Sequence, residues 1–264
     1  MNVKKIAFFL VFLSVFSLNG CTKTVPQKEK NLVQSESLYK QGQKYFLGDG
    51  VKQNFQKALE YFEKAANEGS VVAQNDLAGM YFKGIGTQKN EAKAYYWFNE
   101  ASKLNSSEAQ YNLGVMYDNG YYVDKDRTKA LDYYNLSAKQ GYARAQFSLA
   151  NAYLDGNGIE KDINKAISLY TDAAKQNLPD AQYNLANIYE EGAIVPKDEK
   201  KALDLYIQAA NQNFPIAQNN LRYMYANTYN DLEKAKYWFQ RAFENGYKDA
   251  GDALKKIESI SNSK

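Results

Sequence analysis

The sequence predicts an all-α fold: an α-solenoid of six helix-turn-helix repeats, each of 36 residues, followed by a C-terminal capping helix. The dipeptide Ala-Gln recurs every 36 residues, and Leu and Tyr follow each of its alanines after four and eight residues. An Asn or Asp also precedes a Lys-Ala pair in every copy. A constant period of this length is typical of stacked units, each of which buries its apolar face against its neighbours.

The first helix of each repeat is predicted from positions i, i+4 and i+8, which fall on one face of an α-helix. Five copies carry Ala, Leu and Tyr there, and an earlier, weaker copy supplies Tyr45. The residues are Ala73, Leu77, Tyr81; Ala109, Leu113, Tyr117; Ala145, Leu149, Tyr153; Ala181, Leu185, Tyr189; and Ala217, Leu221, Tyr225.

A connector with glycines follows, because glycine accepts the positive φ at which a helix stops and turns. The connector glycines are Gly48, Gly50, Gly84, Gly86, Gly120, Gly156, Gly158 and Gly192. The sixth copy, with Asn227, Thr228 and Tyr229, lacks these glycines and is three residues shorter.

The second helix is predicted to begin after a residue whose side chain accepts from its first amides. These residues are Asn54, Asn90, Asp126, Asp162, Asp198 and Asp231. It is expected to end where Gly or Asn accepts a left-handed conformation. These positions are Gly69, Asn105, Gly141, Asn177, Asn213 and Gly246.

Three further positions recur inside the second helix. A Lys three residues after each cap opposes the helix dipole, so we expect its stem to cover apolar surface while its head reaches solvent or a carbonyl. Aromatic residues follow at Phe62, Phe98, Tyr134, Tyr170, Tyr206 and Phe239. A small residue comes three positions later, which lets two helices approach closely.

Together these positions resemble the Sel-one-like repeat (SLR), a relative of the tetratricopeptide repeat. The resemblance covers about residues 36–250 in six copies. It implies a right-handed superhelix with an extended concave surface, and the usual work of such a surface is binding. The apolar residues Ala253, Leu254, Ile257 and Ile260 predict that residues 251–264 form a capping helix and tail.

The amino terminus predicts export and lipid anchoring. Residues 1–20 carry two lysines and then a short apolar run, as in a signal peptide, and the run is too short for a membrane-spanning helix. Leu18, Asn19 and Gly20 before Cys21 resemble the bacterial lipobox, which implies acylation of Cys21 and an outer-membrane anchor facing the periplasm. An ordinary cleaved signal is the alternative. Residues 21–35 are expected to be a flexible tether.

Composition excludes several chemistries. Of the 264 residues none is His and one is Cys, so no His-based nucleophile, no His metal site and no internal disulfide can form. We expect neither a cofactor nor a metal. The net charge of +3 falls to +1 without Lys4 and Lys5, which gives no indication of nucleic-acid binding.

The candidate binding groove follows from the resemblance, because the concave residues of tetratricopeptide repeats lie on the first helix. They are Tyr111, Phe147 and Tyr183 in one row, Asn151, Asn187 and Tyr223 in a second, and Asp118, Asp155, Glu190 and Glu191 beside them. In the second copy, Asn75 occupies the first-row position and Gly79 occupies the second-row position. Together with Asp180, these four acidic residues face only Lys83 and Arg144, which predicts an acidic, aromatic C-terminal half suited to a basic or extended peptide. Alternatively, the aromatic row packs between repeats.

We therefore expect a lipid-anchored, periplasm-facing scaffold that binds a protein partner in its groove, with no enzymatic activity. The resemblance includes lipoproteins that protect a bacterium against toxic effectors, so an immunity role is the narrower expectation. Two alternatives stay open. One is a β-lactamase-like or penicillin-binding enzyme, although those relatives carry a disulfide in each repeat. The other is a structural role at the cell wall.

Overall fold

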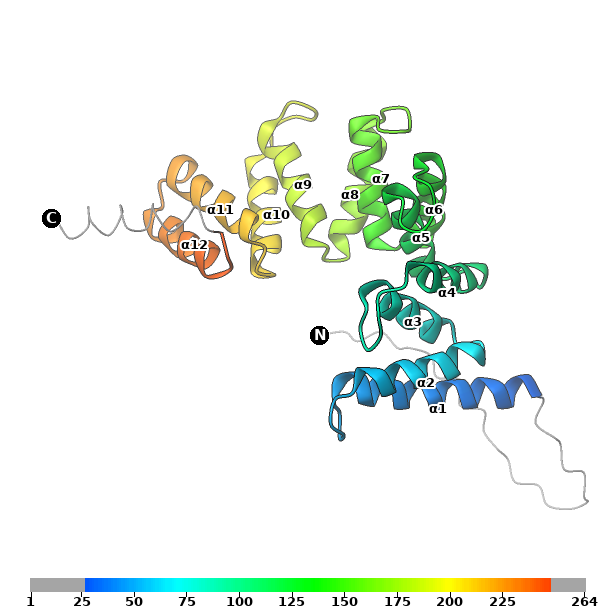
Figure 1. Ribbon diagram of the computed structural model, residues 1–264. Helices are drawn as coiled ribbons and strands as arrows, with labels where there is room; N and C mark the ends of the chain where they lie inside the picture. Colours follow the sequence, from blue (N-terminus) through cyan, green and yellow to red (C-terminus); the bar gives the residue numbers. More distant parts are fainter. Residues whose placement is uncertain (1–26, 248–264) are drawn as a thin grey trace, which may run out of the picture.

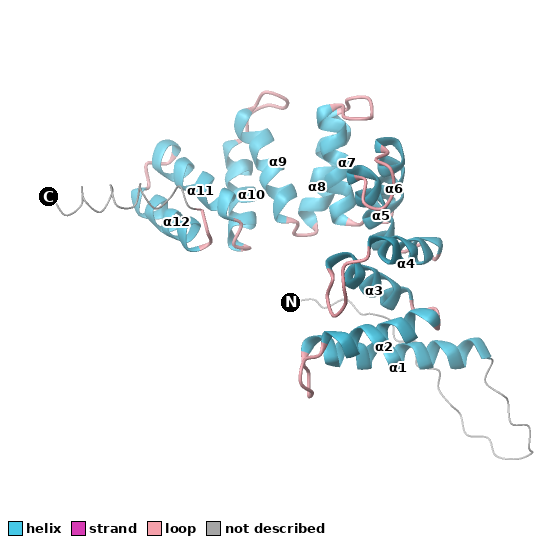
Figure 2. Ribbon diagram, in the orientation of Figure 1, coloured by secondary structure: helices cyan, strands magenta, loops and turns pink. Residues whose placement is uncertain are grey.

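The computed structural model describes residues 27–247, which form paired helices stacked in an arc (Figure 1). Twelve α-helices and one π-helical segment make up this part of the chain, and it contains no strand (Figure 2). The predicted solenoid of six repeats is therefore confirmed. The predicted signal peptide, Cys21 and the capping helix with Ala253, Leu254, Ile257 and Ile260 lie outside the described residues.

Each repeat contributes a first and a second helix, and each pair packs side by side. The first helices are α1 (Gln27–Leu47), α3 (Val71–Lys83), α5 (Ser107–Asn119), α7 (Ala143–Asp155), α9 (Pro179–Glu191) and α11 (Pro215–Tyr223). The second helices are α2 (Phe55–Asn67), α4 (Glu91–Lys103), α6 (Arg127–Lys139), α8 (Ile163–Lys175), α10 (Glu199–Asn211) and α12 (Leu232–Glu244).

The segment predicted as a tether differs from the expectation, since α1 already begins at Gln27. Residues 27–35 are rich in Gln, Lys, Glu and other residues that lose little side-chain freedom in a helix. The exposed pair Glu36 and Lys40, whose Oε1 and Nζ lie 2.7 Å apart, adds a helical i,i+4 contact one turn later. The polar composition of this segment and its lack of apolar periodicity predicted a flexible chain, but the helix propensity of its residues was sufficient to form the start of α1.

The six predicted N-caps are confirmed. Each Asn or Asp side chain accepts from the backbone N–H of the Lys three residues on, at 2.9–3.0 Å. The backbone N–H of the same cap residue donates to the carbonyl of the tyrosine that ends the Ala-Leu-Tyr face, at 2.8–3.0 Å. These two bonds close every connector in the same way. Second helices end as predicted, because all six Gly and Asn positions have φ between 61° and 96°.

The core lies between the two helices of each repeat and between neighbouring repeats. The recurring Ala and Leu of the first helices are buried, and so are the second-helix aromatics. Gly114 shows how close the packing is, because a Cβ there would lie 2.6 Å from the ring of Tyr134. Buried hydrophobic residues form two clusters, residues 58–116 and 130–238, so the core divides between α5 and α6.

The last repeat departs from the pattern. Its first helix ends at Tyr223 and continues as a π-helix, Met224–Thr228. Arg222 occupies a position that is Gly or Ala in the other copies, and its guanidinium stacks over the rings of Tyr223 at 3.8 Å and Phe239 at 4.6 Å. The shorter connector was evident in the sequence, but the wider helical turn that accompanies it was not.

Candidate functional site

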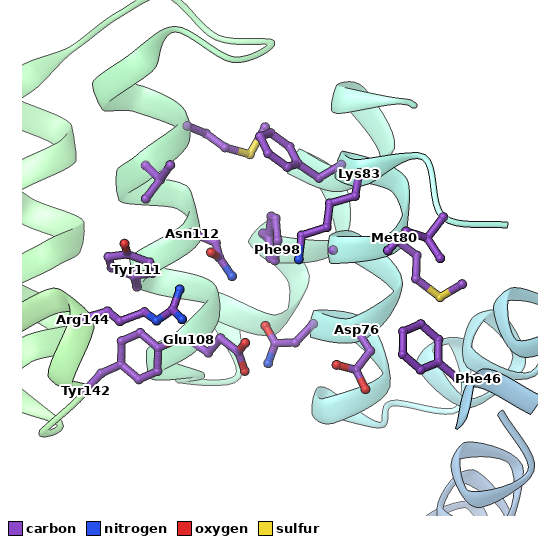
Figure 3. A pocket seen from close by; sticks show the side chains of 16 residues that line it. Phe46, Asp76, Met80, Lys83, Phe98, Glu108, Tyr111, Asn112, Tyr142 and Arg144 are labelled. Carbon is purple, nitrogen blue, oxygen red and sulfur yellow. The ribbon is translucent and has the colours of Figure 1, made fainter. Parts of the chain in front are cut away.

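A cavity of about 470 Å³ opens on the face formed by the first helices (Figure 3). Its lining comes from α1, α3, α5 and the start of α7, together with Phe98 of α4. Side chains from four successive first helices can reach one cavity only on the inner side of the bend. The cavity therefore marks the concave surface of the solenoid.

The cavity lies where the row of first-helix aromatics is interrupted. In the third, fourth and fifth repeats, a ring of this row packs on the aromatic residue of the second helix, with centroids 5.7–5.9 Å apart. In the second repeat the same position is Asn75, so Phe98 has no ring above it. One turn further along, Gly79 has no side chain, and a Cβ there would meet nothing within 4 Å. The missing ring and the missing side chain leave the space open.

The inner wall combines apolar and polar groups. Met80, Phe98 and Met116 are buried among the lining residues. Asn75 is only 8% exposed, and its Nδ2 donates to Ser106 Oγ at 2.8 Å. Its Oδ1 is buried and has no hydrogen-bond partner within residues 27–247. A buried acceptor without a partner is costly, which marks this wall as a place where a donor would be stabilised.

Asp76 and Glu108 place two carboxylates on the cavity, from α3 and α5. Tyr39 OH donates to Asp76 Oδ2 at 2.8 Å, while burial raises the pKa of Asp76 above its ordinary value. Glu108 is exposed at the mouth, where desolvation and then the charge of Asp76 raise its pKa. In Figure 3, Phe98 and Asn112 lie above the level of these two carboxylates.

Two exposed cations, Lys83 and Arg144, also line the cavity. In Figure 3 the amino group of Lys83 points toward Phe98, and the side chain of Arg144 extends toward Glu108. Both lower the pKa of Glu108 through longer-range attraction, yet neither makes an ion pair in the part of the chain that the structure describes. The charged groups of Lys83, Arg144 and Glu108 are thus not paired with one another, which leaves them available to a ligand.

The side chains of the predicted aromatic row mainly pack against other side chains of the protein. Tyr111, Phe147 and Tyr183 are half-buried against Tyr134, Tyr170 and Tyr206, in that order. Tyr111 also lines the cavity, together with Asn75 and Gly79 of the predicted rows. These ring contacts join the two helices of a single repeat, so the alternative expectation, packing between repeats, stays a prediction.

The predicted asparagines bind neighbouring repeats. Asn151 Oδ1 accepts from Tyr170 OH, and Asn184 Nδ2 of the next repeat donates to the same hydroxyl at 3.4 Å. Asn187 repeats this arrangement with Tyr206 and Asn220.

The predicted acidic residues have different surroundings from one another. Asp118 pairs with Arg127 at 2.7 Å, a cation at the start of α6 that the count of first-helix charges left out. Glu190 accepts from Tyr206 OH at 2.5 Å, which helps to raise the pKa of that tyrosine after burial. Asp155 and Glu191 are exposed, and so is Tyr223, against which Arg222 stacks. The acidity of the C-terminal half is therefore reduced, and its role in binding stays a prediction.

The recurring lysine has a partner that the sequence reasoning missed. In all six repeats its Nζ lies over the ring of the tyrosine that ends the Ala-Leu-Tyr face, 4.1–5.3 Å from the centroid. The aliphatic stem covers apolar surface as expected, but the head contacts a π-face. The sequence did contain a signal for this contact, because the Lys and the Tyr recur together in every repeat.

Within residues 27–247, no three carboxylate, Cys or His side chains are grouped so that they could hold a metal ion. None of the helices in this part of the chain has the length and apolarity needed to cross a membrane.

The Sel1 repeat family model matches residues 35–70, 71–106, 107–142, 143–178, 179–214 and 215–247. A crystal structure of a Sel1 repeat protein from Oxalobacter formigenes has a TM-score of 0.75 and 29% identity, covering 80% of this chain and 87% of that one. A search of curated proteins gives no match.

Two immunity proteins from Pseudomonas aeruginosa have the same fold at lower identity. PA5088 has a TM-score of 0.56 and 19% identity, over 88% of this chain and 85% of that one. Pa5087 has a TM-score of 0.53 and 20% identity, over 86% and 84%.

Proposed function

Because the chain belongs to the Sel1 repeat family, whose repeats mediate protein–protein interaction, we propose that it is a scaffold that binds a protein partner on its concave surface. The observation that carries this is the cavity of about 470 Å³, in which the buried Asn75 Oδ1 has no partner within the described residues. Its volume lies in the ordinary range for ligand sites. The family is generally non-enzymatic, so we propose binding rather than catalysis.

The concave surface can be tested by photo-crosslinking in cells. A photoreactive phenylalanine analogue replaces Tyr111, which lines the cavity, or Tyr96, which is 54% exposed on the second helix α4. We expect a protein adduct from position 111 and none of the same mass from position 96. An adduct shared by both positions, or no adduct from position 111, would contradict the proposal.

We further propose that the scaffold is anchored through Cys21 to the outer membrane and faces the periplasm. The signal-like residues 1–20 and the lipobox-like residues before Cys21 support this. Two acyl chains would make the anchoring stable, since one chain binds only marginally. Growth with an alkyne-bearing palmitate should label the chain, and Cys21→Ser should lose the label. Fractionation of labelled cells should then place the chain in the outer membrane; a soluble, unlabelled chain would contradict the anchor.

Within this function we propose a narrower role as an immunity protein against an effector that acts in the periplasm. Two proteins of the same fold are immunity proteins, a likeness that concerns the fold and leaves the partner open. Expression of this chain should protect susceptible cells against an effector encoded beside it and delivered to the periplasm. Equal killing with and without the chain would remove this role and leave the scaffold function intact.

A further inference from the structure

The later repeats are joined by a recurring three-residue hydrogen-bond relay. In the first example Tyr170 OH donates to Asn151 and receives Asn184 Nδ2. In the second example the same groups belong to Asn187, Tyr206 and Asn220. Each relay connects a first helix, its own second helix and the next first helix, so it fixes the interface between two repeats.

The cavity occupies the equivalent place between the second and third repeats, one of three junctions from which the relay is missing. Subtracting two 36-residue periods brings Asn151 to Gly79, Tyr170 to Phe98 and Asn184 to Asn112. Gly79 has no acceptor and Phe98 has no hydroxyl. As a consequence, the side-chain amide of Asn112 makes no hydrogen bond within the described residues. Two of three relay members are absent, and the third faces the space that they leave.

Hydrogen-bond acceptors dominate the inner wall of this space. Asn75 Oδ1 is buried without a partner among residues 27–247, and Asp76 uses one oxygen for Tyr39 and leaves Oδ1 unbonded there. Asn112 offers an amide oxygen, and Glu108 adds a second carboxylate at the mouth. The ring of Phe98 and the thioether of Met80 supply apolar surface beside them. A long side chain that carries donors at its end and an aliphatic stem behind them complements this wall.

Resting on the proposed function, we propose that the cavity seats one basic side chain of the partner, an arginine or a lysine. Its stem lies against Phe98 and its charged head lies between Asp76 and Glu108, within reach of Asn75 Oδ1. A cation there relieves the repulsion between the two carboxylates and supplies the donor that Asn75 lacks. Lys83 and Arg144 line the same cavity and are exposed, so solvent screens their repulsion. Binding requires the flexible side chain of Lys83, which points toward Phe98 in Figure 3, to turn away.

Methionine methyl groups report on this site directly. The chain has four methionines; Met80 and Met116 line the cavity, while Met224 lies in the π-helix of the last repeat and serves as an internal control. The full-length chain, labelled with 13C at its methionine methyl groups in detergent micelles, is titrated with the blocked peptide Gly-Ala-Arg-Ala-Gly. Matched peptides carry lysine, neutral citrulline or glutamate in place of arginine.

We expect the arginine and lysine peptides to shift the Met80 and Met116 signals saturably and to leave Met224 in place. The citrulline peptide should bind about tenfold more weakly or worse, since it loses one charge-assisted contact worth at least ~1.4 kcal/mol. Glutamate peptide binding of equal strength would overturn the proposal, because Lys83 and Arg144 would then dominate. Shifts of all three methyl signals, or none, would also overturn it.

A matched pair of variants locates the charge. Asp76→Asn keeps an acceptor for Tyr39 OH, and it should weaken the arginine peptide about tenfold or more. Asp155→Asn removes an exposed carboxylate of the predicted C-terminal groove and should leave the affinity unchanged. If Asp155→Asn weakens binding and Asp76→Asn does not, the site is wrong. An Asp76→Asn variant that binds the arginine peptide as tightly as the unchanged chain refutes the basic anchor. Absence of the adduct from position 111 of the unchanged chain refutes the proposed function, so the two failures are distinguishable.

Discussion

The junction between the second and third repeats and the junction between the fifth and sixth have the same arrangement of helices. The first contains a cavity, whereas the second is filled by hydrogen-bonded side chains. In the later junction Tyr206 OH contacts Asn187, Glu190 and Asn220, and a ring from Tyr183 covers it. In the earlier junction the equivalent of Tyr206 is Phe98, with a cavity above it.

This difference shows how a repeat protein makes a site from a structural interface. Neighbour contacts recur along a solenoid, so one copy can lose a contact while the others hold the array together. Loss of a ring at Asn75, of an acceptor at Gly79 and of a hydroxyl at Phe98 opens the cavity without altering the helices around it. Binding capacity and local stability are therefore expected to trade against each other along this chain.

The largest expected effect comes from removing the covering rings. Joint replacement of Tyr111, Phe147 and Tyr183 by Ala should lower the free energy of unfolding by roughly 4–6 kcal/mol, because each half-buried ring leaves part of a cavity behind it. Urea unfolding followed by circular dichroism measures this. The matched triple of exposed aromatics, Tyr96, Tyr229 and Tyr237 to Ala, should cost much less. Equal costs would mean that the row is a free surface rather than an interface.

The next effect concerns the hydroxyl of the closed junction. Tyr206→Phe removes the one hydroxyl proton that Asn187 and Glu190 share, and it should cost about 1–3 kcal/mol. Tyr111→Phe is the control, because that hydroxyl makes no hydrogen bond within residues 27–247. The same urea titration applies. A cost for Tyr111→Phe as large as that for Tyr206→Phe would show that the relay contributes nothing particular to the later junction.

Installing the relay in the open junction tests the comparison in the other direction. Gly79→Asn together with Phe98→Tyr rebuilds the Asn, Tyr and Asn positions around Asn112, and open space at Gly79 admits the new side chain. We expect a gain of roughly 1 kcal/mol from the added hydrogen bonds and from replacing a helical glycine. Binding of the arginine peptide should be lost at the same time. A double variant that is more stable yet still binds the peptide would separate the relay from the site.

The local features of the fold could be predicted from the sequence because they depend on neighbouring residues. A cap such as Asp126 acts on an amide three residues away, and Asn105 takes its left-handed φ within a single turn. The recurrence in register then fixed the order of helices. The π-helix at Met224–Thr228 could not be predicted in this way, since it results from fitting a shorter connector and Arg222 into a stack of fixed geometry.

The candidate site was predictable only in part. Tyr111 was identified from its row, but Asp76 and Glu108 come from two successive repeats, meet only as lining residues of one cavity, and share no sequence motif. The charge count of the C-terminal half left out Arg127, because this residue lies at the start of α6 and reaches back to Asp118. Comparison of equivalent positions would have revealed the broken relay at Gly79 and Phe98, although not the volume that it leaves.

The smallest effect should be the same in both regions, since the Lys–Tyr contact occurs in every repeat. Lys93 Nζ lies 4.7 Å from the ring centroid of Tyr81, and Lys201 Nζ lies 4.1 Å from that of Tyr189. Replacing either lysine by Gln should cost about 0.5–1 kcal/mol relative to Lys200→Gln, as expected for an exposed cation–π contact.

The control isolates the contact with the tyrosine, which includes a hydrogen bond from Nζ to the hydroxyl. Lys200 also lies in the first turn of α10, and its removal relieves the helix dipole to a similar degree. Urea unfolding of the three single variants measures the difference. If Lys93→Gln costs several times more than Lys201→Gln, the two regions differ in their general rigidity. The difference between the two junctions would then result from the packing of all the repeats rather than from Asn75, Gly79 and Phe98, the three positions that open the cavity.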